Sequence, residues 1–136
     1  MNTPLLVTAV SDAAPYTVNL EDGSGHRWLA DEPRQSGGAD AGPNPHQLLL
    51  SALGACTSIT LRMYAARKGW PLAGIEVALE FNPAGQPAAG GSEIRRRIKL
   101  RGGLSDEQRE RLLEIANRCP IHQVLSGEVR IESSLT

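Results

Sequence analysis

The segment that most constrains the fold is GPNPHQLLLSALGACTSITLRMYAARKGW, residues 42–70. Asn44 suits a helix N-cap, Pro45 suits the first helical position, and Gly69 suits a helix end. We therefore expect one helix over residues 45–68, about 35 Å long at 1.5 Å per residue. Apolar residues cover most of its circumference, and a helix that is apolar all round has to be buried all round. One small sheet covers one side only, so the pattern predicts that a second copy of the chain covers the other side.

Length and charge narrow the classes of function. The 136 residues suffice for one domain, residues 1–136. The net charge of −1 lacks the basic excess of a nucleic-acid binder. The first residues lack the positive region of a signal peptide, and Arg62, Arg67 and Lys68 interrupt the long apolar run. We therefore expect a cytoplasmic protein with no nucleic-acid partner and no membrane partner.

The rest of the chain reads as an α+β protein, with a Gly- and Pro-rich loop over residues 33–45 that is long enough to be functional. Ser105 and Gln108 form a capping-box pattern that begins one helix, and Pro120 begins a shorter one. Strands are predicted at residues 5–10, 16–22, 26–32, 74–82, 93–101 and 128–133.

A basic cluster falls in the strand predicted at residues 93–101. We interpret it as a solvated strand face, with Ile94, Ile98 and Leu100 turned to the core, and a ligand-binding patch is the alternative. The cluster consists of Arg95, Arg96, Arg97, Lys99 and Arg101.

The chain has two cysteines, Cys56 and Cys119. In a reducing compartment we do not expect them to form a permanent structural disulfide. Cys56 taken alone could be a core thiol. Cys119 precedes Pro120 and so occupies an N-cap, where backbone N–H groups and the helix dipole favour the thiolate. Together they form the minimal set for reducing a peroxide. One thiolate becomes a sulfenic acid, the second thiol closes a disulfide, and an external dithiol reduces it.

A metal site is a further alternative for the cysteines. Cys56, Cys119, His46 and His122 supply the residue types of a Cys2His2 zinc centre. The spacing argues against it, because only Cys119 and His122 are close in sequence and no paired CxxC element is present.

Three motifs give the chain a family resemblance. GPNPHQLLLSALGACTS, RCPIHQVLSG and ADEP resemble the OsmC/Ohr family of osmotically induced and organic hydroperoxide resistance proteins. TLRMYAARKGWPL resembles the OsmC-like branch, and the resemblance runs from Trp28 to Gly127. It implies an OsmC-like α+β fold, with antiparallel sheets around a long central helix, in an intertwined homodimer.

The resemblance also implies a chemistry. It implies thiol peroxidase activity on organic hydroperoxides in the oxidative stress response, at sites on the dimer interface. Cys56 matches the peroxidatic cysteine and Cys119 the resolving one. The family needs no metal or flavin cofactor, and a lipoyl-type or other dithiol is the expected reductant. The rival hypothesis is a non-catalytic protein of this fold that binds an apolar small molecule at the dimer interface.

The sequence departs from the best-studied branches in one place. Those branches carry a Glu near the start of the cysteine helix, which positions an Arg against the thiolate. Here the position holds His46, or Gln47 if the register differs by one. Arg27 and Arg34 are candidates for the cation, with surface arginines as the alternative. His46 either lines the pocket or is exposed, and His122 either holds the second thiol or packs.

Overall fold

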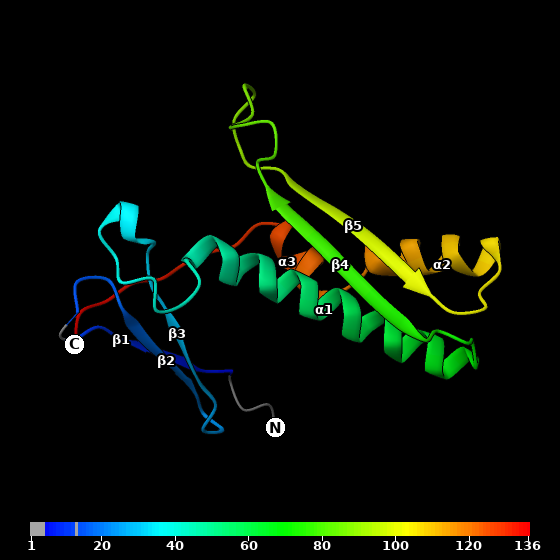
Figure 1. Cartoon of the computed structure of the whole chain (residues 1–136), viewed down its shortest axis with the longest axis horizontal. Helices are drawn as coiled ribbons and strands as arrows, with labels where there is room; N and C mark the ends of the chain where they lie inside the picture. The colour runs from blue at the N-terminus through cyan, green and yellow to red at the C-terminus, as the bar shows by residue number, and fades with distance from the viewer. Residues whose placement is uncertain (1–4, 13) are drawn as a thin grey trace. The chain divides into compact units, whose positions relative to one another are not determined.

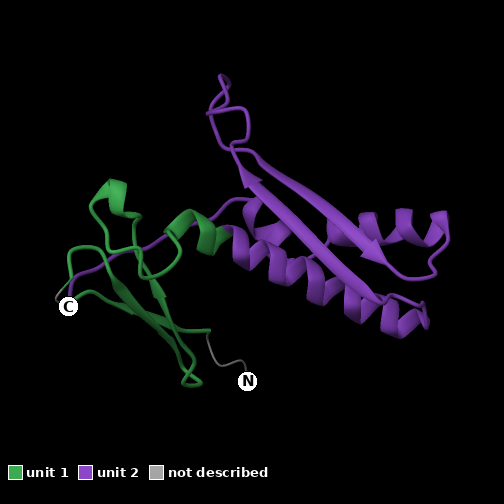
Figure 2. Cartoon of the chain, in the orientation of Figure 1, with its two compact units in different colours: residues 1–49 green, residues 50–136 purple. Residues whose placement is uncertain are grey.

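The computed structural model describes residues 5–12 and 14–136 of the chain (Figure 1). The chain divides into two compact units, Met1–Leu49 and Leu50–Thr136, which are coloured separately in Figure 2. The predicted α+β class is confirmed. The elements are β1 (Val7–Val10), β2 (Val18–Asp22), β3 (Arg27–Ala30), the 3-10 helix η1 (Arg34–Ser36), α1 (Pro45–Lys68), β4 (Gly74–Phe81), β5 (Ile94–Arg101), α2 (Asp106–Ala116) and α3 (Pro120–Leu125).

The three strands predicted in the first unit form an antiparallel meander, in the order β1-β2-β3. Val7 pairs with Asp22 at one end of the sheet, and Val18 pairs with Ala30 on the other side of β2. The turn after β2 is held by the Asp22 carboxylate, which accepts hydrogen bonds from the backbone N–H groups of Ser24 and His26 at 2.8 and 2.9 Å. Aspartate satisfies turn backbone in this way, which explains why the strand ends there.

Asp31 organises the Gly-rich loop that follows β3. Its buried carboxylate accepts hydrogen bonds from the Thr17 hydroxyl at 2.8 Å and from the backbone N–H groups of Glu32 and Ala41 at 2.7 and 3.2 Å. Burial raises the pKa of Asp31, but these hydrogen bonds outweigh it and hold the pKa below its ordinary value. One side chain thus ties both ends of the loop to the end of the sheet.

The long helix α1 begins and ends where its sequence predicts. The Asn44 side chain accepts from the Gln47 backbone N–H, and the Gln47 side chain accepts from the Asn44 backbone N–H, both at 2.9 Å. This reciprocal pair closes the N-terminus as a capping box does. Gly69 stands at φ 68°, and Trp70 N–H donates to the Ala65 carbonyl at 2.9 Å. A left-handed residue is the common way to end a helix, and glycine takes it without strain.

In the second unit, the β4–β5 hairpin and α2 pack with α1 around one core. Gly74 pairs with Arg101 and Phe81 with Ile94, so the strands predicted at residues 74–82 and 93–101 form a hairpin. The predicted capping box of Ser105 and Gln108 is present at the start of α2. The buried core residues are Leu61, Ala65, Leu72, Leu104, Leu112, Ile115 and Ala116.

The outer face of α1 is apolar and exposed within one chain. Leu53, Thr57, Leu61 and Ala65 form the buried stripe of the helix. At 100° per residue, the residues two positions after the first three, Ala55, Ile59 and Met63, point to the opposite side, and Ala52 and Ala66 lie about one turn before and after them. The residue two positions after Ala65 is the exposed Arg67, where the apolar run ends. We call the opposite side the outer face; it consists of Ala52, Ala55, Ile59, Met63 and Ala66, all exposed.

By length and composition alone, α1 is long enough and apolar enough to cross a membrane. A core helix of a soluble protein meets the same criteria. Length and composition therefore do not distinguish a membrane-spanning helix from a core helix.

The strand predicted at residues 128–133 is wrong. Within residues 5–12 and 14–136 this segment joins neither sheet. Val129 and Ile131, which alternate as strand residues do, are exposed. A strand exists through hydrogen bonds to a neighbour, and alternation by itself does not supply that neighbour.

Candidate active site

Cys56 lies on α1, half-buried, and its sulfur faces the start of α3. The backbone N–H of Ile121 donates to Cys56 Sγ at 3.4 Å. The next residue, Thr57, is fully buried, and its hydroxyl donates to the Leu53 carbonyl one turn earlier at 2.7 Å. The helix backbone and the buried stripe therefore fix the position of this thiol.

Cys119 is the N-cap of α3, as its place before Pro120 predicts. Its backbone is extended, at φ −64° and ψ 144°, and its buried sulfur accepts from the backbone N–H of His122 at 3.3 Å. Ile121 and His122 are neighbours in the first turn of α3. Adjacent N–H groups of one helical turn thus contact the two cysteine sulfurs.

Arg96 joins the segments that carry the two cysteines. From β5, its Nη1 donates to Thr57 Oγ1 at 3.0 Å, and its Nη2 donates to Asn117 Oδ1 at 3.0 Å. The same Nη2 lies 3.1 Å from His122 Nδ1. Arg96 is half-buried, so the prediction that the whole basic cluster is a solvated face is wrong at this residue. It is correct for Arg95, Arg97, Lys99 and Arg101, which are exposed.

His122 is held as a neutral ring. A guanidinium can only donate, so His122 Nδ1 accepts from Arg96 and the ring proton is assigned to Nε2. Burial lowers the pKa of His122 below its ordinary value of 6.5, and the positive charge of Arg96 lowers it further. The backbone N–H of His122 contacts Cys119 Sγ, and its ring contacts Arg96, a partner that neither reading of His122 named.

A cavity of about 450 Å³ lies beside this cluster. Its walls combine leucine and isoleucine side chains with the polar groups of Arg96, Asn117 and His122. An apolar pocket with a few convergent polar groups is the usual form of a small-molecule site. The lining residues are Leu53, Ser92, Ile94, Arg96, Leu113, Asn117, His122, Leu125 and Ser126.

The other predicted site residues lie in the first unit, whereas both cysteines lie in the second. His46 and Gln47 are exposed in the first turn of α1, where Gln47 caps the helix with Asn44. Arg34 is exposed in η1. The structure therefore brings together Cys56, Cys119 and His122.

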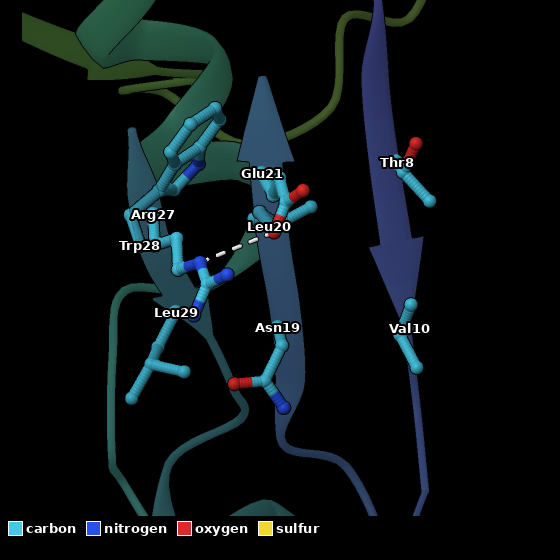
Figure 3. A pocket seen from close by; sticks show the side chains of 8 residues that line it. All are labelled: Thr8, Val10, Asn19, Leu20, Glu21, Arg27, Trp28 and Leu29. Carbon is cyan, nitrogen blue, oxygen red and sulfur yellow. Dashed lines mark ion pairs between the residues drawn. The ribbon is translucent and has the colours of Figure 1, made fainter. Parts of the chain in front are cut away.

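Arg27 belongs to a hollow of about 490 Å³ on the three-stranded sheet (Figure 3). Its Nε is 3.1 Å from Glu21 Oε2, and both side chains are exposed. The dashed line in Figure 3 marks this ion pair. The observed partner of Arg27 is thus a carboxylate of the neighbouring strand.

The zinc alternative finds no support in the geometry. Among residues 5–12 and 14–136, no group of three His, Cys, Asp or Glu side chains is placed to hold a metal ion. Four such ligands are the norm at a structural zinc site.

Sequence reasoning missed Arg96, although the signal was present. Ile94, Ile98 and Leu100 were assigned to the core face of the strand, and strand side chains alternate between faces. Arg96 has the same parity as these three residues. Alternation therefore predicts that it faces inward, and the burial pattern of β5 follows that alternation.

Comparison with known proteins places the chain in a family. The model of the OsmC-like protein family matches residues 37–134. The chain therefore belongs to the OsmC-like protein family. No curated protein matches it.

Solved structures share the fold. An OsmC-like protein from Mycoplasma pneumoniae is 22% identical, with a TM-score of 0.77 over 93% of this chain and 90% of that one. An organic hydroperoxide resistance protein OsmC from Legionella pneumophila is 21% identical, with a TM-score of 0.69 over 92% and 90%. One from Elizabethkingia anophelis is 19% identical, with a TM-score of 0.67 over 93% and 91%.

Proposed function

We propose that this protein is a thiol-dependent peroxidase that reduces organic hydroperoxides. The observation that carries the proposal is the pairing of Cys56 and Cys119 at one helical turn, through the N–H groups of Ile121 and His122. Membership of the OsmC-like family supports it. So do the organic hydroperoxide resistance proteins of the same fold from Legionella pneumophila and Elizabethkingia anophelis.

The proposed reaction begins at Cys56. Its thiolate attacks one peroxide oxygen, the O–O bond breaks, and the alkoxide leaves and takes up a proton to become the alcohol. Cys56 then carries a sulfenic acid. Cys119 attacks that sulfur, an S–S bond forms, the S–O bond breaks, and water leaves. An external dithiol, of lipoyl or another type, exchanges with the disulfide and returns two electrons.

Cys56 suits the first role and Cys119 the second because of their burial. Cys56 is half-buried, whereas Cys119 is fully buried as the cap of α3. A hydroperoxide therefore reaches Cys56 first. The cavity beside Arg96 and His122 offers apolar walls for an organic group.

The partners belong to the same proposal. The exposed apolar outer face of α1 supports a homodimer, because a helix apolar on all sides requires cover on all sides. A dithiol reductant suits a cytoplasmic protein, since the reducing compartment supplies it.

Steady-state reduction of cumene hydroperoxide with dihydrolipoamide tests the function. We expect turnover in the wild type and none in Cys56→Ser. In Cys119→Ser, we expect a sulfenic acid on Cys56 that dimedone traps after one equivalent of peroxide. Turnover that persists in Cys56→Ser would place the attacking sulfur elsewhere.

The cavity also motivates a second candidate, a protein that binds an apolar small molecule without turnover. Leu53, Ile94, Leu113 and Leu125 supply its apolar walls. Native mass spectrometry that finds a co-purified ligand, together with a Cys56 thiol still free after peroxide exposure, would favour this candidate over the peroxidase.

A further inference from the structure

Arg96 makes three hydrogen bonds to three separate segments. It reaches α1 through Thr57, the α2–α3 connection through Asn117, and α3 through His122. A guanidinium has five N–H donors in a fixed planar fork, so one side chain can hold several acceptors at once. Arg96 is therefore a three-way bridge across the second unit.

Arg96 differs from the neighbouring arginines on β5 in the partners of its charge. Arg97 Nη1 is 2.9 Å from Glu80 Oε1, and Arg95 Nη1 is 4.0 Å from the same oxygen. In the described part of the chain, no carboxylate pairs with Arg96. Its partners are a hydroxyl, an amide and an imidazole, all neutral. A half-buried cation held by neutral acceptors is costly for folding alone, which points to a role at the site.

Two of the three acceptors of Arg96 lie beside a cysteine. Thr57 follows Cys56 directly on α1. His122 supplies the N–H that contacts Cys119 Sγ, at 3.3 Å. Arg96 thus reaches the Cys56 segment through the residue that follows Cys56, and the Cys119 segment through the residue that hydrogen-bonds to its sulfur.

We propose that Arg96 is the positioning residue of the two-cysteine site, which holds the first turn of α3 against α1 so that Cys119 can form a disulfide with Cys56. This rests on the proposed function and names the residue that governs its second step. In that step the Cys119 sulfur attacks the Cys56 sulfenic sulfur, so the two atoms have to be held in line.

Thiol–disulfide exchange tests the positioning without any peroxide. Oxidised glutathione takes two electrons from Cys56 and Cys119, which yields their disulfide and two molecules of reduced glutathione. The equilibrium constant measures how closely the folded chain holds the two sulfurs together. It is read by mass spectrometry after acid quenching, over a range of glutathione ratios.

We expect Arg96→Gln and Arg96→Lys to lower this constant by at least about tenfold, the effect of losing one hydrogen bond to a charged group. Glutamine is uncharged and shorter, and lysine is a point charge that cannot bridge three acceptors. Arg97→Gln, an exposed neighbour on the same strand, is the matched control and should keep the wild-type constant. A wild-type constant in Arg96→Gln, or full rescue by lysine, overturns the proposal.

One further measurement and one further variant separate positioning from folding. The unfolding midpoint of each reduced variant shows whether it is folded. A variant that is less stable but keeps the wild-type glutathione constant contradicts positioning. Should Arg96→Gln fail to fold, Asn117→Ala removes one exposed acceptor of the bridge and should lower the same constant.

Peroxide chemistry gives the final readout. After one equivalent of cumene hydroperoxide, Arg96→Gln should accumulate a dimedone-trapped sulfenic acid on Cys56, whereas Arg97→Gln should close the disulfide. If the wild type does not react with peroxide, the peroxidase proposal fails and the glutathione constant still tests Arg96. If peroxide is reduced and the constant is unchanged in Arg96→Gln, the positioning role alone fails.

Discussion

Ile59 offers a quantitative test of the proposed homodimer. It lies on the outer face of α1 and is 55% exposed within one chain. Full burial of the carbons lost in Ile59→Ala is worth about 2.4 kcal/mol, at about 0.8 kcal/mol per methylene. The exposed share that a partner would cover then contributes about 1.3 kcal/mol per chain. Each substitution counts twice in a two-fold dimer, so the dissociation constant should rise roughly 70-fold.

Sedimentation equilibrium across nanomolar to micromolar protein measures that constant directly. Leu61→Ala on the same helix is the control, because Leu61 is fully buried within its own chain. It should lower the free energy of unfolding by about 3 kcal/mol and change association little. A wild-type dissociation constant for Ile59→Ala, or a wild type that is monomeric at micromolar concentration, would refute the reasoning.

Two further predictions concern stability. Since the pKa of His122 is lowered in the folded chain, the unfolded chain binds protons more readily as pH falls through 6.5, and the free energy of unfolding falls with it. His122→Asn should reduce this fall, measured by urea unfolding at pH values from about 7.5 to about 5.5. The prediction fails if the free energy of unfolding of His122→Asn falls with pH as steeply as that of the wild type. Ser105→Ala removes the cap of α2 and should cost about 1 kcal/mol in the same assay, with Glu110→Ala, an exposed α2 residue, as the comparison; an unchanged midpoint would count against that cap.

Local signals predicted the elements whose ends are decided locally. The bounds of α1 depend on Asn44, Pro45 and Gly69, which act on backbone groups within one turn. The start of α2 depends likewise on Ser105 and Gln108. The α+β class followed from the order of the predicted elements, whereas the sheet arrangement followed from the family resemblance, because patterning alone rarely determines how strands pair.

Features that depend on distant residues were harder to predict. Residues 128–133 alternate like a strand, yet a strand requires a neighbour that the segment itself does not encode. Arg27 and Arg34 were plausible cations on sequence order, whereas Arg96 on β5 is the arginine that hydrogen-bonds to Thr57 and His122. Its contacts join residues 39 and 26 positions away, a separation at which sequence spacing carries no information.

The N-cap sulfur of Cys119 affects how its mutants should be read. Serine caps helices well and alanine caps them poorly, so the two usual thiol-free replacements are not equivalent here. Because α3 spans only six residues, its cap serves a large share of its backbone N–H groups. Cys119→Ser removes the redox group and keeps the cap, whereas Cys119→Ala removes both. The difference between their unfolding midpoints measures what the cap contributes to stability, separately from the redox role of the thiol.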